Sequence, residues 1–324
     1  MTGRPATRAL RAGILGGMAR TIVIAGSPTA LGGHFGGMER SPAALRGAGL
    51  AQRLGDDPVF DGVGWQDAGD APNDPGWLPD PDPRAKNRDA IVAYLPRLAE
   101  HVATALDGVA ADVDPRLLVL GGDCTSHVGA LAGLRRARPD ARFGLVWFDA
   151  HGDFNTPDTT PSGNVWGMPF AMLCGRGDPD LVGAGDGASV READAALVGG
   201  QVLDETESRM LAASAVAHFG AGMIATDAGR AALAAWCATV ATRIDAWYVA
   251  FDLDAIDAGE GLALAMTETD GISVADAVAA VRIVAASGPV AGIGATAAMD
   301  GDVGDLGRTV DAIVALTGAA LGPA

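Results

Sequence analysis

The sequence predicts an α/β fold, a three-layer αβα sandwich in which helices cover both faces of a central, mainly parallel sheet. Short apolar runs alternate along the chain with segments that have helical periodicity. The runs are continuously apolar instead of alternating with polar residues, which is typical of parallel strands buried on both faces. The alternation of strands with helices indicates one three-layer domain.

Each predicted element follows from one such segment. Strands are expected at residues 21–26, 117–122, 143–150, 196–200 and 246–254, and helices at 89–106, 227–244 and 274–286. Residues 55–83 are rich in Pro, Gly and Asp. The alternation resumes unchanged after them, so we expect a long acidic surface excursion within one domain and not a linker between two.

The first twenty residues carry four arginines and no acidic residue. A transit peptide fits them less well than an over-long start, because their apolar part is short and interrupted by glycine. We therefore expect residues 1–19 to form a disordered extension and residues 20–324 to form a single domain.

Composition excludes several classes of protein. The chain has 324 residues, 49% of them hydrophobic, and a formal charge of -17, which opposes binding to nucleic acid. No apolar run approaches the roughly 20 residues of a membrane span, so we expect no membrane partner. Three cysteines without a C-x-x-C spacing favour free thiols in a reducing compartment, and hence a cytoplasmic location.

Two of the predicted strands end in acidic residues at two-residue spacing. One block gives Asp149, His151 and Asp153, and the other gives Asp252 and Asp254. Residues two apart in an extended chain face the same side, and ligands bind beyond the carboxyl ends of parallel strands. A single Asp pair would be explained by turn chemistry. Two blocks would crowd like charges together and favour a bound cation.

Such a site suits Mn²⁺ or a similar hard ion, since its donors are carboxylates with an imidazole. A pair of ions would lower the pKa of a water and supply hydroxide near neutral pH. Cys124 follows another strand end, in "GGDC". Taken alone it indicates packing, because free cysteine is among the most buried residue types.

Three sequence blocks together resemble a known family. "GGDC", "DAHGDFNTPDTTPSGNVWGMP" and "FDLDAID" are similar, in this order, to the signature blocks of the ureohydrolase superfamily of arginases, agmatinases and formimidoylglutamases. The likeness covers about residues 21–320. It implies a central eight-stranded parallel sheet, a dinuclear manganese centre whose bridging hydroxide attacks a guanidino carbon, and a homo-oligomer, trimer or hexamer.

The resemblance assigns metal ligation residue by residue to Asp149, His151, Asp153, Asp252 and Asp254. At the sixth position, where the family has the histidine of a GGDH motif, this chain has Cys124. A thiol suits Zn²⁺ or iron better than Mn²⁺, so we expect the metal position beside Cys124 and Asp153 to be weak, exchanged or empty. His127 is expected to be an ordinary helix histidine.

The resemblance also implies a substrate site. It assigns the grip on an amino-acid carboxylate to Asn155, Thr160, Ser162 and Asn164, which favours an amino acid over the decarboxylated agmatine. It assigns binding of the substrate's α-amino group to Asp204 and Glu207. These two also form a D-x-x-E helix start, so capping would also explain both, and the substrate role is favoured more for Asp204 than for Glu207.

Two departures from the family pattern bear on chemistry. Trp166 stands where the family has a proton-shuttling histidine, so Asp153 or the bridging hydroxide would carry the proton. Asp270 stands where arginases hold the guanidinium with glutamate, with Glu268 as a substitute. Cys124 and Trp166 together resemble the branch that acts on Nω-hydroxy-L-arginine, whose hydroxyguanidine is less basic and needs an imidazole less.

The sequence thus predicts a metal-dependent amidinohydrolase. The expected substrate is L-arginine or Nω-hydroxy-L-arginine, a small guanidino amino acid, and the products are ornithine with urea or hydroxyurea. Two alternatives remain open. One is an agmatinase-like or other guanidino or formimino hydrolase. The other is a metal-poor, catalytically weakened homologue with a binding role.

Overall fold

The computed structural model describes residues 19–301 and 303–323. Within them, eight strands form one sheet in which every neighbouring pair is parallel. The strands are β1 (Ala19–Ser27), β2 (Gly64–Asp70), β3 (Val113–Gly121), β4 (Phe143–Asp149), β5 (Ala195–Gly199), β6 (Ala217–Phe219), β7 (Ala246–Asp252) and β8 (Val290–Thr296). Their order is β2-β1-β3-β8-β7-β4-β5-β6.

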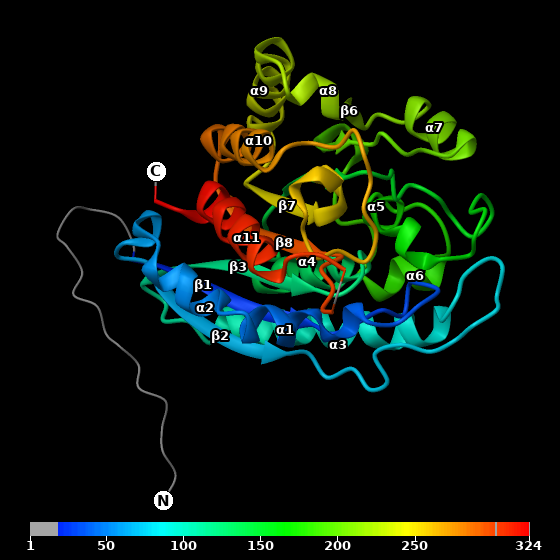
Figure 1. Cartoon of the computed structure of the whole chain (residues 1–324), viewed down its shortest axis with the longest axis horizontal. Coiled ribbons are helices and arrows are strands. Elements are labelled where there is room, and N and C mark those ends of the chain that lie inside the picture. Colours follow the sequence, from blue (N-terminus) through cyan, green and yellow to red (C-terminus); the bar gives the residue numbers. More distant parts are fainter. Residues whose placement is uncertain (1–18, 302, 324) are drawn as a thin grey trace, which may run out of the picture.

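Helices cover both faces of this sheet (Figure 1). They are α1 (Ser41–Gly47), α2 (Leu50–Asp56), α3 (Arg88–Asp107), α4 (Ser126–Ala137), α5 (Pro169–Leu173), α6 (Pro179–Ala184), α7 (Glu205–Ala212), α8 (Ala221–Ile224), α9 (Asp227–Ala241), α10 (Val274–Ser287) and α11 (Leu306–Leu321). No helix in the described part of the chain is long and apolar enough to cross a membrane.

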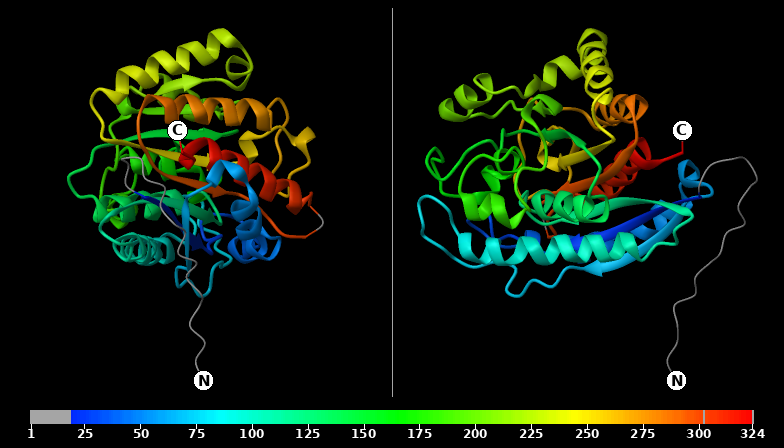
Figure 2. Two further views of the ribbon diagram at one scale, coloured as in Figure 1. Left: turned by 90° about the vertical axis from the view of Figure 1, so that its left-hand side faces the viewer. Right: turned by 180° about the vertical axis from the view of Figure 1, so that it is seen from behind.

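The core divides into two apolar layers because successive strand residues face opposite ways. Ile22 and Ile24 of β1 pack with α1, α2, α9, α10 and α11 on one face. Val23 and Ala25 pack with α3, α4, α5 and α6 on the other. The two helical layers lie on opposite sides of the sheet in Figure 2. The predicted three-layer α/β architecture is therefore confirmed, with a sheet that is parallel throughout.

Three strands were not predicted. β2 lies in the middle of residues 55–83, so the expected long surface excursion is interrupted by a strand at Gly64–Asp70. Its residues "GWQDAGD" give no apolar run, because β2 is an edge strand whose one neighbour among the described strands is β1. β6 has three residues, and β8, "VAGIGAT", is rich in small residues. The expected disorder of residues 1–19 falls outside the described residues except at Ala19, where β1 begins.

The strand order places the chemical blocks of the sequence together. β3, β8, β7 and β4 are neighbours in the middle of the sheet. Phe148 pairs with Phe251, so the adjoining Asp149 and Asp252 end adjacent strands. Cys124 follows the end of β3 in the short connection to α4. All of these groups therefore meet beyond the carboxyl ends of the strands.

Candidate metal centre and substrate cavity

A cavity of about 280 Å³ lies beyond the carboxyl ends of the central strands. Its walls include all six residues that the family resemblance assigns to metal ligation: Cys124, Asp149, His151, Asp153, Asp252 and Asp254. Two overlapping groups among them have donor atoms within 4.8 Å of one another. Asp149 belongs to both groups, as a carboxylate shared by two ions would.

The first group is Asp149, His151 and Asp254. The Nδ1 atom of His151 lies 3.3 Å from Oδ1 of Asp149 and 3.1 Å from Oδ2 of Asp254. Adjacent ligands of an ion bound at about 2.1 Å lie roughly 3 Å apart, so these separations fit one ion.

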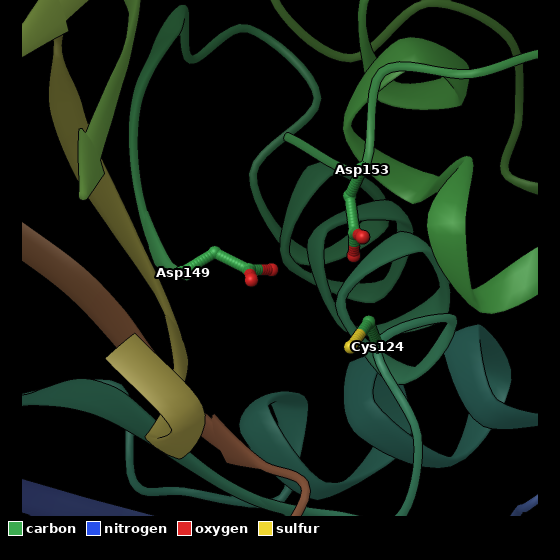
Figure 3. A group of neighbouring side chains, drawn as sticks. All are labelled: Cys124, Asp149 and Asp153. Carbon is green, nitrogen blue, oxygen red and sulfur yellow. The ribbon is translucent and has the colours of Figure 1, made fainter. Parts of the chain in front are cut away.

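The second group is Cys124, Asp149 and Asp153, whose side chains point into a common space in Figure 3. Oδ2 of Asp153 is buried and has no hydrogen-bond partner in the described part of the chain. Sγ of Cys124 donates to Oδ2 of Asp252 at 2.6 Å. An unpartnered buried oxygen beside a thiol and further carboxylates is a donor set that a cation would complete.

The pKa values show the effect of crowding these acids. Burial, together with the charge of Asp149, raises the pKa of Asp153 well above its usual range. Burial and the charge of Asp254 do the same to the pKa of Asp252, and burial raises the pKa of Asp254 to about 6. Burial opposes ionisation of Asp149, but hydrogen bonds led by His151 hold its pKa below the usual range. Protons thus replace part of the charge that a metal would neutralise.

Neighbouring groups fix these side chains in place. Trp147 Nε1 donates to Oδ2 of Asp149 at 2.9 Å, and the Ala150 amide donates to Oδ1 of Asp254 at 3.1 Å. Asp153 has a φ of +49°, in the left-handed region that Asp tolerates better than most residues. Such a conformation costs free energy and is typical of functional sites.

Glu207 supports the loop that carries His151 and Asp153. It is 4% exposed and accepts hydrogen bonds from the amides of Phe154 at 2.9 Å and Gly152 at 3.3 Å. A Cβ on Gly152 would lie 2.5 Å from Cδ of Glu207, so only glycine permits this approach. Burial raises the pKa of Glu207 to about 7.

His127 is buried in α4 and is not a member of either candidate metal group. Its Nδ1 lies 3.0 Å from the Tyr248 hydroxyl, and its Nε2 lies 3.2 Å from Oγ1 of Thr296. That hydroxyl in turn lies 3.3 Å from Oδ2 of Asp252. Burial lowers the pKa of His127 to about 3, so the ring is neutral. The sequence interpretation of His127 as a helix histidine is correct, but the link through Thr296 to Asp252 was missed because β8 was not predicted.

The loop after β4 lies on another wall of the cavity and contributes Asn155, Thr160, Ser162 and Asn164. Thr160 Oγ1 accepts from the Gly163 amide at 3.0 Å, and Ser162 Oγ accepts from the Asn164 amide at 3.2 Å. Both hydroxyl groups act here as acceptors, which leaves their hydrogens free to donate to a ligand.

Asp204 has the geometry of a helix cap. Its Oδ1 accepts from the amides of Thr206 and Glu207, each at 2.8 Å, at the start of α7. Its Oδ2 accepts from Nδ2 of Asn155 at 2.7 Å, so it also orders the loop opposite. Asp204 and Glu207 both line the cavity, while their contact with a substrate stays a prediction.

Trp166 forms an aromatic wall together with a loop near the start of the chain. Its ring centroid lies 5.3 Å from those of His34 and Phe35. A Cβ on Gly33 would lie 2.1 Å from the indole, so the ring occupies space that glycine leaves open. His34 lines the cavity beside Trp166. The sequence prediction missed it, although "GGHFGG" after the first strand is a glycine-rich loop of the kind that allows close approach.

Asp270 is exposed, has a φ of +60° and is not among the residues that line the cavity. Glu268 lies closer to the candidate metal centre, since its Oε1 is 3.7 Å from Nε2 of His151. Beyond β8 the cavity wall is formed by Ala297, which carries no charge. The structure therefore brings together every predicted site residue except Asp270.

Comparison with known proteins agrees with this geometry. The sequence profile of the Arginase family matches residues 20–295. Arginase from Bacillus caldovelox is 30% identical over 249 residues, which are 74% of this chain and 77% of that protein. Arginase from Bacillus subtilis (strain 168) is 34% identical over 195 residues, 60% of this chain and 62% of that protein.

The solved structure of native arginase from Bacillus caldovelox superposes on 94% of this chain and 99% of its own, with a TM-score of 0.81 and 26% identity. The fold, the sheet order that assembles the cavity and the sequence matches agree. The chain therefore belongs to the arginase family, whose members are hydrolases of C–N bonds in amidines.

Proposed function

We propose that this protein is a metal-dependent amidinohydrolase that cleaves a guanidino C–N bond of L-arginine or Nω-hydroxy-L-arginine. The products are ornithine with urea or with hydroxyurea. One observation carries the proposal: a single cavity holds the cluster of acids with His151 and also the hydroxyl-bearing loop of Thr160 and Ser162. One end suits a cation and the reacting group, and the other suits a carboxylate.

The residues that would hold metal are Cys124, Asp149, His151, Asp153, Asp252 and Asp254. We assign two manganese ions to them because Asp149 belongs to both groups of donors. When bound, the metal would act as a Lewis acid and lower the pKa of a water in the cavity. The Cys124 thiol is a soft donor. The metal position beside it would therefore bind Mn²⁺ less tightly than it would with an imidazole ligand, or would accept another divalent ion.

The loop after β4 would bind and orient the amino-acid end of the substrate. Thr160 and Ser162 can donate their hydroxyl hydrogens to a carboxylate. Asp204 accepts from Asn155 and is available to a cationic α-amino group on the same side. Agmatine has no carboxylate and would lose these hydrogen bonds, which supports an amino acid as substrate.

Hydrolysis requires a proton to pass from the attacking water to the leaving nitrogen of ornithine. The buried carboxylate of Asp153 lines the cavity and would carry the proton in transit through an oxygen that does not bind metal. Trp166 cannot exchange a proton and instead excludes water from that wall. Nω-hydroxy-L-arginine fits this arrangement because a hydroxyguanidine is less basic than a guanidine.

The test is turnover by the purified protein, prepared metal-free and then supplied with Mn²⁺, Zn²⁺ or Fe²⁺. Release of urea, hydroxyurea and ornithine is measured with arginine, Nω-hydroxy-L-arginine and agmatine. Asp254→Asn should lower kcat/KM at least as much as the roughly 10- to 100-fold seen when supporting groups of metal ligands are lost. Turnover of no substrate with any of the metals would refute the proposal.

A preference for agmatine would favour the agmatinase-like alternative and would refute the role of Thr160 and Ser162. Metal analysis of the protein as purified tests the alternative of a metal-poor binding protein. That alternative predicts less than one ion per chain and no turnover. Sedimentation of the same sample tests the expected trimer or hexamer.

A further inference from the structure

Lys86 is the only lysine in the chain, and it reaches the edge of the substrate cavity. Its Nζ donates to Oδ1 of Asn164 at 2.7 Å. Among residues 19–301 and 303–323, no carboxylate lies within 4.0 Å of this ammonium group. Asp80 lines the same surface depression as Lys86, but the Asp80 oxygens accept from the amides of Asn87 and Asp82. The ammonium group of Lys86 therefore donates to the side-chain amide of Asn164, which lines the cavity.

This contact fixes the orientation of the Asn164 side chain. An ammonium group can only donate, so the amide must turn its oxygen toward Lys86 and its nitrogen away. Nδ2 of Asn164 lies 3.0 Å from Nδ1 of His34. Because Nδ2 is a donor, Nδ1 of His34 must be the acceptor and the ring proton must sit on Nε2. Lys86 thus selects the Nε2–H tautomer of His34 through Asn164, which lies between them in the hydrogen-bond chain.

The position of His34 is fixed by its contact with Trp166 and by its place in the cavity wall. The ring lies edge-on to Trp166, whose amide donates to the Gly32 carbonyl at 3.1 Å. His34 is exposed and lines both the substrate cavity and the adjoining depression that contains Lys86. His34 therefore has Nε2–H as its donor, on a side chain that lines the cavity together with Asn164.

Charge is distributed unevenly along the cavity. The inner end holds Asp149, Asp153, Asp252 and Asp254, whereas Lys86 supplies a positive charge beside the outer wall. In a chain with a net charge of -17, Lys86 places a positive charge away from the acids of the inner end, and Asp80 in the adjoining depression offsets part of it.

We propose that Lys86, through Asn164, positions His34 as an Nε2–H donor, and that this Lys86–Asn164–His34 chain recognises the carboxylate of the substrate. This inference deepens the proposed function and rests on it. His34 is the binding residue, and Lys86 is a positioning residue whose charge adds to the attraction.

Kinetics separate this role from a general structural one. Lys86→Met and His34→Phe should each raise the KM for the amino-acid substrate and the inhibition constant of ornithine by about tenfold, since a charge-assisted donor is lost. The inhibition constant of putrescine, which lacks the carboxylate, should not change, and kcat should stay within about twofold. Lys86→Arg should restore most of the affinity for ornithine.

The double variant gives a sharper test. Both residues act in one hydrogen-bond chain. The double variant Lys86→Met with His34→Phe should therefore weaken ornithine binding little more than either change alone. Arg97→Met is the charge-matched control, because Arg97 is on α3 and its Nε donates to the Ala93 carbonyl of its own helix. Equal weakening of ornithine and putrescine, or full additivity in the double variant, would overturn the proposal.

The single lysine also allows a direct measurement. Reductive methylation with ¹³C-formaldehyde labels Lys86 and the α-amino group, and these give separate NMR signals. Titration with ornithine should shift the Lys86 signal, and putrescine should leave it unmoved. A Lys86 signal that stays fixed at ornithine concentrations that inhibit the enzyme fully would overturn the inference alone. Absence of turnover by the wild-type protein would instead overturn the proposed function.

Discussion

Sγ of Cys124 and Oδ2 of Asp252 are 2.6 Å apart, although β8 lies between β3, after which Cys124 follows, and β7, which ends at Asp252. Burial, followed by the charge of Asp252, raises the pKa of the Cys124 thiol well above its usual range, so the thiol stays protonated and donates a hydrogen bond to the carboxylate. A metal would have to displace that proton. The hydrogen bond between Cys124 and Asp252 therefore stabilises the metal-free site and lowers its affinity for metal.

Replacement of Cys124 by His should strengthen manganese binding. An imidazole is a better ligand than a thiol for Mn²⁺, and its ordinary pKa of about 6.5 lies below that of a thiol, so its proton is easier to displace. We expect the dissociation constant of the weaker ion to fall by at least about tenfold, measured by calorimetry, while zinc gains less. Cys174→Ser is the control, since Cys174 is not among the residues that line the cavity. Unchanged manganese affinity in Cys124→His would contradict ligation at this position.

Glu207 should make the metal-free protein less stable as the pH rises. The folded protein keeps the Glu207 proton up to a pKa of about 7, whereas the usual value is 4.5. Between these values the folded state binds more protons than the unfolded state, so the free energy of unfolding falls with rising pH. The fall from this one group is at most about 3 kcal/mol.

Chemical denaturation of the metal-free protein between pH 4.5 and 7.5 measures this slope. Glu207→Gln should flatten it, while Asp254, whose pKa is raised to about 6, keeps part of it. Glu205→Gln is the matched control because Glu205 is exposed on the same helix. Identical slopes for wild type and Glu207→Gln would show that Glu207 is ionised throughout.

Thr296 should support metal binding from behind Asp252. Thr296→Val removes the hydroxyl between His127 and Asp252, which leaves a buried imidazole nitrogen without its partner. We expect a loss of about 1–3 kcal/mol in stability and roughly 10- to 100-fold in metal affinity. Thr317→Val, which removes a buried hydroxyl that among the described residues donates to the Ile313 carbonyl alone, should cost stability without affecting the metal. Equal metal affinity in the two variants would exclude a link through Thr296.

Gly33 should be intolerant of even one methyl group. A Cβ there would lie 2.1 Å from the Trp166 ring, so Gly33→Ala must displace either the indole or the loop that holds His34. Overpacking of this kind costs about 1–3 kcal/mol, and a displaced wall should also raise KM. Gly55→Ala in α2 is the control, because no atom of the described part of the chain lies within 4 Å of the added Cβ outside its immediate neighbours, and it should be neutral or stabilising. Thermal unfolding of both variants decides.

Local periodicity was enough to predict much of the fold and part of the site. Uninterrupted apolar runs mark β3, β4, β5 and β7, because a strand buried on both faces needs apolar residues at every position. The spacing of Asp149 with Asp153 and of Asp252 with Asp254 placed acids at strand ends, which follows from the two-residue repeat alone. The family resemblance added which acids share a site.

Strands without an apolar signal could not be found in this way. β2 is a polar edge strand, β6 has only three residues, and β8 is built from small residues that fit between its neighbours. The omission of β8 also hid Thr296 and Ala297 from the site, since both lie at its carboxyl end.

By itself the sequence determined the class of fold, the acidic strand ends and the presence of a thiol where an imidazole is expected. Only the tertiary structure decided that Cys124 bonds Asp252, that Asp270 lies away from the cavity, and that Lys86 reaches His34 through Asn164. The reason is physical: spacing along one strand or helix is a local property. Which side chains from different segments touch depends on strand order and on loops, and long-range packing sets both.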